Sequence, residues 1–368
     1  MIRDEVPNFM TRLQAYSEPV SRITGIGVEL PARVVTNKDL LQLVDAPPEV
    51  KRRLIKLIDR VTGVKTRRFA ESTTCPSDLA CAAAEKAMQH AQARASDIDT
   101  LIFSATDMDV LEPSTANILQ RKLRIPVVNA FDVTNACNSF LQGMNVANSM
   151  IALGAARKVL VTSGEIGSQW ANRQVNAISE LNAKMGGLTL GDAGAAVVME
   201  RANGVAGLLE INLMSLGQHW EACHVPERTN WREVEPRSIH GWFFLDMGEL
   251  ADVAREATVE YFKDYIEYRR ESAGERKFID GLTQVIPHQI SRRFIEDIGA
   301  SVARHIGSID SEKVCITADI YGNTASTSIP LAICKLMDDG VLEFGSGQEI
   351  MAYGAASGFG IGHIRLRL

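Results

Sequence analysis

The chain lacks any cysteine pattern that indicates a disulfide framework or a thiol-based metal site. Its six cysteines include no CxxC pair, and their spacings are not typical of disulfides in a chain of 368 residues. We therefore expect free thiols in a reducing compartment, with the cytoplasm as the default location. The seven histidines are scattered without ligand spacing, so no metal ion is expected.

Long apolar runs and an excess of positive charge are also missing. No uninterrupted apolar stretch is long enough to span a bilayer, and the N-terminal MIRDEVPNFM carries charges and a proline where a signal peptide needs an apolar run. The formal net charge of −6 argues against a broad nucleic-acid-binding surface. We expect neither a membrane span nor a nucleic-acid partner. With 46% hydrophobic residues, the chain has material for a large core.

Apolar periodicity predicts an α/β protein in which strands and helices alternate through two successive sets of elements. The first set has predicted strands at 23–30, 101–105, 127–133, 158–162 and 195–199. The second set has predicted strands at 205–213, 284–287, 313–316, 349–353 and 364–368, with helices at 249–271, 291–305 and 326–338. We expect two βαβαβαββ halves, residues 1–203 and 204–368, pressed together into a layered α/β/α/β/α body. Residues 1–20 are expected to be a short polar extension.

The main chemical signal lies in FDVTNACNSF, residues 131–140, where a predicted strand runs into Cys137. Apolar residues recur at helical spacing from Phe140 onward, which puts Cys137 beside a helix N-terminus. Unpaired backbone N–H groups and the helix dipole favour an anion there, so this position predicts a thiol whose pKa is lowered toward neutrality. Such a thiolate is a nucleophile. The alternative is that Cys137 is one more small buried apolar residue.

Two further strand ends carry polar residues that suit the same chemistry. His288 follows the predicted strand 284–287, and Asn323 lies in the turn YGNTAS at 321–326, before a helix with Ser/Thr start signals. Taken singly, each is also explained as an ordinary turn residue. Together, a thiolate that attacks one carbonyl and N–H donors that hold negative charge on a second carbonyl form a plausible reaction site.

A loop of small residues near the C-terminus adds candidate hydrogen-bond donors. The segment AASGFGIG, residues 355–362, offers backbone N–H groups for an oxyanion hole near Cys137. It lacks the strand-Gly-helix order of a dinucleotide fingerprint, because the chain ends six residues later. We therefore do not expect the loop to bind phosphate.

Five motifs in order make the chain resemble the thiolase-fold condensing enzymes, specifically the β-ketoacyl-ACP synthase III group. The resemblance covers nearly the whole chain. The motifs are TGV at 62–64 with Arg67 and Arg68, NAC at 135–137, GDAGA at 191–195, PHQ at 287–289 and YGNTASTSIP at 321–330. On its own, the basic run 65–68 is typical of a solvated face. Within the resemblance, Arg67 becomes a candidate substrate-binding residue, as do Ser357 and Gly358.

The resemblance implies a ping-pong Claisen condensation without a cofactor. An acyl group from a CoA or carrier-protein thioester loads onto Cys137, and a second thioester, positioned by His288 and Asn323, becomes the carbon nucleophile. In decarboxylating members the second thioester carries a malonyl group. The backbone N–H of Cys137 and one from the Ser357–Gly358 loop are expected to bind the thioester oxyanion. Homodimerisation is expected from the resemblance alone.

Some features resemble instead the olefin-biosynthesis branch, which joins two acyl-CoA chains head to head without decarboxylation. They are LEPSTA at 111–116, LTLG at 188–191, and ASGFG and HQIS where other members have a Gly-Gly-Gly run and HQAN. In that branch a glutamate in the Glu-Pro-Ser-Thr motif reaches the partner subunit's pocket and is a proposed base. Glu112 matches it. The alternative is a solvated loop residue, and the subgroup stays open.

Residues 215–247 hold Trp220, Trp231 and Trp242, followed by Phe243 and Phe244. This aromatic segment is a candidate acyl-channel lining, with Phe243 and Phe244 as substrate-binding candidates, or a cover for a dimer partner; simple packing is the alternative. Two other functions also remain open beside condensation. One is acyl transfer to an alcohol or amine in specialised metabolism, and the other is a non-catalytic partner subunit of a homologous synthase.

Overall fold

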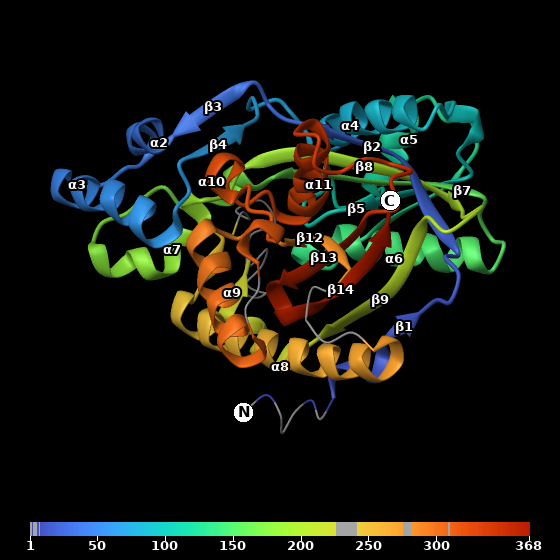
Figure 1. The fold of residues 1–368 in the computed structure, drawn as a ribbon. Helices are drawn as coiled ribbons and strands as arrows, with labels where there is room; N and C mark the ends of the chain where they lie inside the picture. The colour runs from blue at the N-terminus through green and yellow to red at the C-terminus, as the bar shows by residue number, and fades with distance from the viewer. Residues whose placement is uncertain (1, 3–5, 7, 226–240, 275–280, 308–309) are drawn as a thin grey trace.

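Two five-stranded mixed sheets lie face to face with helices between them and on both outer faces (Figure 1). We describe the protein from a computed structural model, which describes residues 2, 6, 8–225, 241–274, 281–307 and 310–368. Within these residues no helix is long and apolar enough to cross a membrane. The arrangement confirms the layered α/β/α/β/α body predicted from the sequence.

The first sheet has the strand order β2-β8-β7-β5-β6. Its strands are β2 (Ser21–Glu29), β5 (Thr100–Ser104), β6 (Asn129–Val133), β7 (Lys158–Ile166) and β8 (Asp192–Arg201). Strand β5 pairs parallel with both β6 and β7, whereas β8 is antiparallel to β7 and β2. The three central strands, β5, β7 and β8, are buried over nearly their whole length. Strand β6, which leads to Cys137, is instead a half-exposed strand at the edge of the sheet.

The second sheet has the strand order β1-β9-β14-β13-β12. Its strands are β1 (Gln14–Ala15), β9 (Gly207–Ser215), β12 (Leu282–Pro287), β13 (Glu349–Ala356) and β14 (Gly360–Arg367). Strands β12 and β13 are parallel, and the remaining pairs are antiparallel. Strand β12 ends immediately before His288, at the edge of the sheet.

Helices fill three layers around the sheets. The outer layer on the first sheet consists of α4 (Pro76–His90) and α5 (Thr115–Lys122), the central layer of α6 (Ser139–Ala152) and α11 (Ser328–Asp338), and the outer layer on the second sheet of α8 (Met247–Ala273) and α9 (Arg292–Ile306). The other α-helices are α2 (Asn37–Leu43), α3 (Pro48–Leu57), α7 (Leu181–Leu188) and α10 (Ala318–Tyr321). Two further antiparallel strand pairs are β3 (Arg33–Thr36) with β4 (Thr66–Phe69), which α2 and α3 separate in the chain, and the short hairpin of β10 (Cys223–His224) with β11 (Phe244–Leu245).

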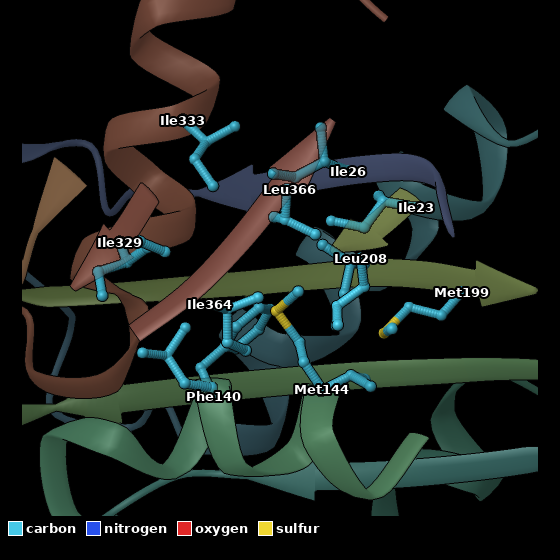
Figure 2. Close-up of a cluster of buried hydrophobic side chains, with 14 of the residues drawn as sticks. Ile23, Ile26, Phe140, Met144, Met199, Leu208, Ile329, Ile333, Ile364 and Leu366 are labelled. Atoms are coloured by element: carbon cyan, nitrogen blue, oxygen red, sulfur yellow. The ribbon is translucent and has the colours of Figure 1, made fainter. Parts of the chain in front are cut away.

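The largest apolar cluster lies between the two sheets. Figure 2 shows Phe140 and Met144 of α6, Ile329 and Ile333 of α11, and side chains from β2, β8, β9 and β14 meeting there. All of the labelled side chains are buried, so their apolar area is removed from water, which is the main stabilising contribution to folding. This packing fixes α6 and α11 relative to each other. Since Cys137 directly precedes α6 and Asn323 precedes α11, it also fixes the two turns that begin these helices.

Two sequence-based expectations about the second sheet are wrong. The predicted strand 313–316 forms only a single parallel bridge, Val285 with Val314, beside β12. The opposite edge is instead extended by β1, whose Gln14 pairs with Ile211 of β9. Residues before 20 are therefore not merely a polar extension: the Phe9 side chain is fully buried in the cluster under α8.

The repeat of the two halves is visible in the turns that lead into the central helices. Ala136 and Ala325 both have a φ of +48°, a left-handed conformation that costs free energy in a residue with a Cβ. Each is the first residue of a short 3-10 segment, which leads into α6 or α11. Ser326 occupies in the second half the position that Cys137 has in the first. The duplication in elements is thus also a duplication of one strained turn.

Candidate active site

Cys137 lies in the strained turn between β6 and α6. Strand β6 ends at Val133, and the hydroxyl of Ser139 accepts a hydrogen bond from the Asn135 N–H and donates one to the Ala136 carbonyl, each at 2.7 Å. These bonds brace the turn and support the left-handed backbone of Ala136. Cys137 consequently lies two residues before Ser139, the first residue of α6, and the backbone N–H groups of that first turn have no helical partner.

His288 is fixed by its backbone and by one ring nitrogen. Its N–H donates to the Tyr353 carbonyl of β13 at 2.8 Å, and its Nδ1 lies 2.7 Å from the hydroxyl oxygen of Ser328. The N–H of Gln289 also points to that oxygen, at 3.4 Å. Within the described residues, the Ser328 hydroxyl proton then has Nδ1 as its acceptor, so we assign the ring proton to Nε2. Burial lowers the pKa of His288 to about 3, and the ring is neutral near pH 7.

Asn323 is held by the other half of the molecule. Its N–H donates to the Thr189 carbonyl at 3.0 Å, and its carbonyl accepts from the Gly191 N–H at 2.9 Å. Its side-chain Oδ1 accepts from the Ala325 N–H at 2.9 Å, so the amide NH₂ is the part of the side chain that remains to donate a hydrogen bond. The preceding Gly322 has a φ of +70° and its backbone comes so close to Thr189 that a Cβ would lie 2.4 Å from the Thr189 carbonyl oxygen. Glycine is therefore required in this turn.

Cys137, His288 and Asn323 line one cavity, together with the predicted residues Ser357 and Phe243. The remaining walls are mostly apolar. They come from the α7 turn, the β10–β11 hairpin, one face of α8, the start of α9 and the loop after β13: Gly186, Thr189, Cys223, Leu245, Leu250, Ala254, Thr258, Ile290, Phe294, Ala355, Ala356, Phe359, Gly360 and Ile361. A sulfur nucleophile, an imidazole and a carboxamide thus face the same apolar space.

A second apolar cavity adjoins the first on the far side of His288. It shares Ala254, Thr258 and Phe294 with the first cavity, among other residues. From there it continues between α8 and α9, where Phe262, Ile298 and Val302 line it. His288 lies at the junction of the two cavities, and almost none of the second cavity's wall is polar.

The pKa of the Cys137 thiol differs from the sequence-based expectation. Burial raises it well above the usual range, and Cys223 and Glu165, when ionised, act in the same direction. The backbone N–H groups of Ser357 and of Cys137 itself lower it, but they do not compensate for burial. The expectation of a lowered pKa was wrong because desolvation outweighs the helix N-terminus. The resting sulfur is a neutral thiol, and the two N–H groups are the pair expected for an oxyanion hole.

Two predicted substrate residues, Phe244 and Gly358, do not line the cavity. Phe244 is 37% exposed and packs against His224. Its neighbours Phe243 and Leu245 face the cavity instead, because successive side chains of a strand point to opposite faces. Gly358 is also absent from the lining, although its neighbour Ser357 belongs to it. Its φ of +73° instead shapes the turn that presents the Ser357 N–H.

Arg67 and Glu112 also lie away from the cavity lining of their own chain. Arg67 is fully buried and donates a hydrogen bond to Asn37 Oδ1 at 2.8 Å. Its Cβ lies against the backbone of the turn at Gly322. Burial lowers the pKa of Arg67 to about 10. Glu112 is exposed on the loop before α5. Of the tryptophans, Trp220 and Trp242 are about half exposed, and Trp231 lies outside the described residues.

Several lining residues were not identified from the sequence. Leu250, Ala254 and Thr258 of α8 recur every four residues, so the helical period of the predicted helix 249–271 contained the signal for this face. Cys223 and Gly186 carried no comparable signal, because they reach the cavity only through the tertiary fold. Among the described residues, no cluster of three or more His, Cys, Asp or Glu side chains is arranged to hold a metal ion.

Two segments of the chain match known family descriptions. Residues 131–217 match 3-oxoacyl-[acyl-carrier-protein] synthase III, and residues 279–368 match its C-terminal part. The chain is 31% identical over 357 residues to the β-ketoacyl-[acyl-carrier-protein] synthase III of Rhodospirillum centenum, covering 94% of this chain and 98% of the relative. It is 33% identical over 352 residues to the enzyme of that name from Thioalkalivibrio sulfidiphilus, covering 94% and 99%.

Solved structures of two kinds are similar to this one. The crystal structure of 3-oxoacyl-[acyl-carrier-protein] synthase III from Aquifex aeolicus has a TM-score of 0.77 and 28% identity, covering 95% of this chain and all of that chain. Cerulenin-bound OleA from Xanthomonas campestris has a TM-score of 0.78 and 25% identity, covering 95% and 97%. The two likenesses are nearly equal, so they do not separate one kind from the other.

Proposed function

The chain belongs to the β-ketoacyl-[acyl-carrier-protein] synthase III family of thiolase-fold condensing enzymes, and we propose that Cys137 is its nucleophile, with His288 and Asn323 as the donors that activate the second substrate. Its function is therefore that of a 3-oxoacyl-ACP synthase III-type acyltransferase. The observation that carries the residue assignment is that these three side chains, contributed by both halves, line one cavity.

The first step loads an acyl group onto Cys137. The sulfur attacks the carbonyl carbon of an acyl-CoA or acyl-carrier-protein thioester, and the N–H groups of Cys137 and Ser357 bind the oxyanion. When the tetrahedral intermediate collapses, the carrier thiol leaves and the acyl group stays on Cys137. The Cys137 proton passes to the departing thiol, since burial keeps the resting sulfur protonated.

The second step forms the carbon–carbon bond. The Nε2–H of His288 and the side-chain amide of Asn323 donate hydrogen bonds to the carbonyl oxygen of a second thioester. They stabilise the enolate that forms when a malonyl group loses carbon dioxide, and the enolate carbon attacks the acyl group on Cys137. A β-ketoacyl thioester forms as the bond between the acyl carbon and the Cys137 sulfur breaks, and the sulfur leaves as a thiolate that takes up a proton from water. Because His288 is neutral, it acts here as a hydrogen-bond donor without bringing a positive charge.

One observation supports a second candidate, the head-to-head joining of two acyl chains. The apolar cavity beyond His288 offers room for a second alkyl chain beside the first, whereas a malonyl group needs no apolar space. A relative with 25% identity and a TM-score of 0.78, OleA from Xanthomonas campestris, has been solved with bound lauric acid and lauroyl-CoA. In this candidate the α-carbon of the second acyl-CoA must lose a proton to a base.

Glu112 is the candidate for that base, and it requires a homodimer. In its own chain Glu112 is exposed and outside the cavity lining, beside Leu111, which is 74% exposed. The edge strand β6 presents unpaired backbone groups next to this loop's helix, α5, and a second copy of the chain is a suitable partner for such an edge. In the dimer that we propose, the loop of one subunit reaches the cavity of the other.

A single incubation series tests the function and separates the two candidates. The protein is treated with one acyl-CoA, with and without malonyl thioester, and adducts are detected by intact-mass spectrometry and products by gas chromatography. We expect an acyl adduct in the native protein and none in Cys137→Ala. Product that requires malonyl thioester and releases carbon dioxide supports the first candidate; product from acyl-CoA alone supports the second. An unchanged adduct in Cys137→Ala would overturn the assignment of the nucleophile.

A further inference from the structure

Ser357 interacts with the sulfur atoms of two different cysteines. Its backbone N–H acts on the Cys137 thiol and lowers the pKa of that thiol, and its hydroxyl oxygen lies 3.0 Å from the sulfur of Cys223. Both cysteines and Ser357 line the same cavity. One residue of the proposed oxyanion hole is therefore attached through its side chain to a second wall of the cavity.

That second wall is the hairpin that also carries the apolar residues facing the acyl group. Cys223 of β10 pairs directly with Leu245 of β11, and Leu245 and Phe243 face the cavity. The Asp246 N–H donates to the Ala222 carbonyl at the base of the hairpin, at 2.8 Å, and the Phe243 N–H, on the loop side of β11, donates to the Trp170 carbonyl at 2.9 Å. A displacement of Phe243 or Leu245 therefore also moves Cys223, because the backbones of β10 and β11 are paired.

The conformation of the turn that contains Ser357 depends on its hydrogen bonds to neighbouring segments. It is a single irregular turn, Ser357–Phe359, in which Gly358 has a φ of +73°. On the other side of the turn, the Phe359 carbonyl accepts a hydrogen bond from the Leu216 N–H at 2.9 Å. The contact between the Ser357 hydroxyl and Cys223 orients the first residue of this turn, whose backbone N–H is the proposed donor to the oxyanion.

We propose that Cys223 is a positioning residue that couples the seating of the acyl chain against the β10–β11 hairpin to the alignment of the Ser357 N–H with the thioester oxyanion at Cys137. The inference rests on the proposed loading of Cys137. An acyl chain long enough to contact Phe243 and Leu245 seats the hairpin, and the bond from Cys223 then holds Ser357 in place. Chain length consequently affects the rate of the loading step itself, and not only substrate binding.

The expected effect is moderate, because the bond joins two neutral groups. Burial raises the pKa of Cys223 to about 11, so its sulfur remains a thiol at neutral pH. Losing a neutral hydrogen bond that aligns a donor is expected to reduce the maximal loading rate by roughly threefold to tenfold.

The experiment is a single-turnover measurement of Cys137 acylation by intact-mass spectrometry, with acyl-CoAs of increasing chain length. For each length, the concentration dependence separates the maximal rate from half-saturation. The variants are Cys223→Ala, Cys223→Ser, Ser357→Ala and the double variant Cys223→Ala/Ser357→Ala. Cys334→Ala is the matched control, since this thiol on α11 is partly buried but outside the cavity lining. Thermal unfolding of each variant verifies that it is folded.

We expect Cys223→Ala to lower the maximal rate for long chains and to leave acetyl-CoA nearly unaffected. Cys223→Ser retains a hydroxyl partner for Ser357 and should restore most of the rate. Ser357→Ala keeps the N–H but loses the hydroxyl, so it should match Cys223→Ala, and the double variant should show no further loss.

Three results would overturn the inference: an unchanged maximal rate in Cys223→Ala at every chain length, an equal loss at every length including acetyl, or additive losses in the double variant. Failure of the native protein to form any adduct would instead overturn the proposed function, and the two failures are therefore distinguishable. If Cys223→Ala does not fold, the comparison of Ser357→Ala with the native protein tests the same bond: the coupling is supported by a loss confined to long chains and overturned by an unchanged rate.

Discussion

The Nδ1 atom of His288 lies 2.7 Å from the hydroxyl oxygen of Ser328, which follows Asn323 by five positions in the turn that begins α11. The imidazole is therefore held by a residue that lies shortly after the one that carries the carboxamide. The same hydroxyl directs the ring proton to Nε2, the nitrogen that remains for the cavity. Ser328 thus determines both where His288 lies and which of its nitrogens donates.

Replacing Ser328 by alanine should separate the two half-reactions. Without the hydroxyl, no hydrogen bond to Nδ1 favours the tautomer that carries its proton on Nε2. We therefore expect condensation to slow by about tenfold while loading of Cys137 changes little. Product formation at saturating second substrate and single-turnover acylation measure the two steps. The control is Ser149→Ala, whose hydroxyl bonds the Asn145 carbonyl on the exposed side of α6. Equal slowing of both steps in Ser328→Ala would contradict this role.

Gly186 in α7 allows Leu245 and Phe243 to pack closely against this helix. A Cβ at this position would lie 2.6 Å from Cδ2 of Leu245 and 2.9 Å from Cε1 of Phe243, and both side chains face the cavity. In Gly186→Ala these flexible side-chain ends must move, and we expect the cavity to narrow. Alanine also favours a helix, so the fold should be retained.

We expect Gly186→Ala to raise the KM for long acyl-CoAs by about tenfold while acetyl-CoA is nearly unaffected, since each lost methylene contact costs part of the binding free energy. Steady-state kinetics over a series of chain lengths measures this. Gly204→Ala is the control, because a Cβ there would meet open space. A preference for longer chains in Gly186→Ala would show that the hairpin moves outward instead.

Local pattern was sufficient to single out the three polar side chains that line one cavity. Cys137 and His288 each follow a strand end and precede a helix, and strand ends gather where α/β proteins place their sites. Asn323 lies in the turn between α10 and α11, where the sequence predicted a turn before a helix. The residue types at these ends narrowed the chemistry further. Because the strands and helices predicted for the two halves follow the same order, the sequence also predicted the five layers. These features depend on short segments, whose periodicity and turn residues can be read without knowing their neighbours.

Features that depend on distant contacts were not predictable in this way. The position of Cys137 before a helix indicates a lowered pKa, yet desolvation within the tertiary fold raises it. The facing of Phe243 rather than Phe244 depends on the register of a two-residue strand, which no periodicity fixes. The edge position of β1 depends on pairing across nearly two hundred residues, from Gln14 to Ile211.

A complementation experiment tests whether Glu112 acts in the partner's cavity. If it does, chains carrying Glu112→Gln and chains carrying Cys137→Ala should each be inactive in joining two acyl-CoAs. When co-expressed, they should form mixed dimers in which the Cys137 of one chain meets the Glu112 of the other. About a quarter of native activity is then expected, because roughly half of the dimers are mixed and each has one intact site.

The same experiment contains its own controls. Glu112→Gln alone should still form the acyl adduct on Cys137, since loading needs no carbon acid, and its condensation should fall by a factor on the order of a hundred or more. Glu71→Gln, another exposed loop carboxylate, should have no effect. If activity does not return in mixed dimers, Glu112 acts within its own chain. If light scattering shows a monomeric protein, the proposed homodimer is wrong.

Glu165 should make the stability of the fold depend on pH. Its carboxylate is fully buried beneath the site, where it accepts hydrogen bonds from the Thr106 N–H, the Asp107 N–H and the Ser326 hydroxyl. Burial, together with the charge of Asp107, raises the pKa of Glu165 to about 7. The folded protein therefore holds a proton here that the unfolded chain releases at about pH 4.5.

The sign follows from this difference in bound protons. The contribution of Glu165 to the free energy of unfolding is complete below pH 4.5 and is lost as the pH rises to about 7, by at most about 1.4 kcal/mol per pH unit. Glutamine has nearly the same shape and does not ionise, so the difference between native protein and Glu165→Gln should decline over this window and be constant above it. Urea unfolding at several pH values measures the difference, and a difference that rises with pH would mean that the folded site holds Glu165 as a carboxylate.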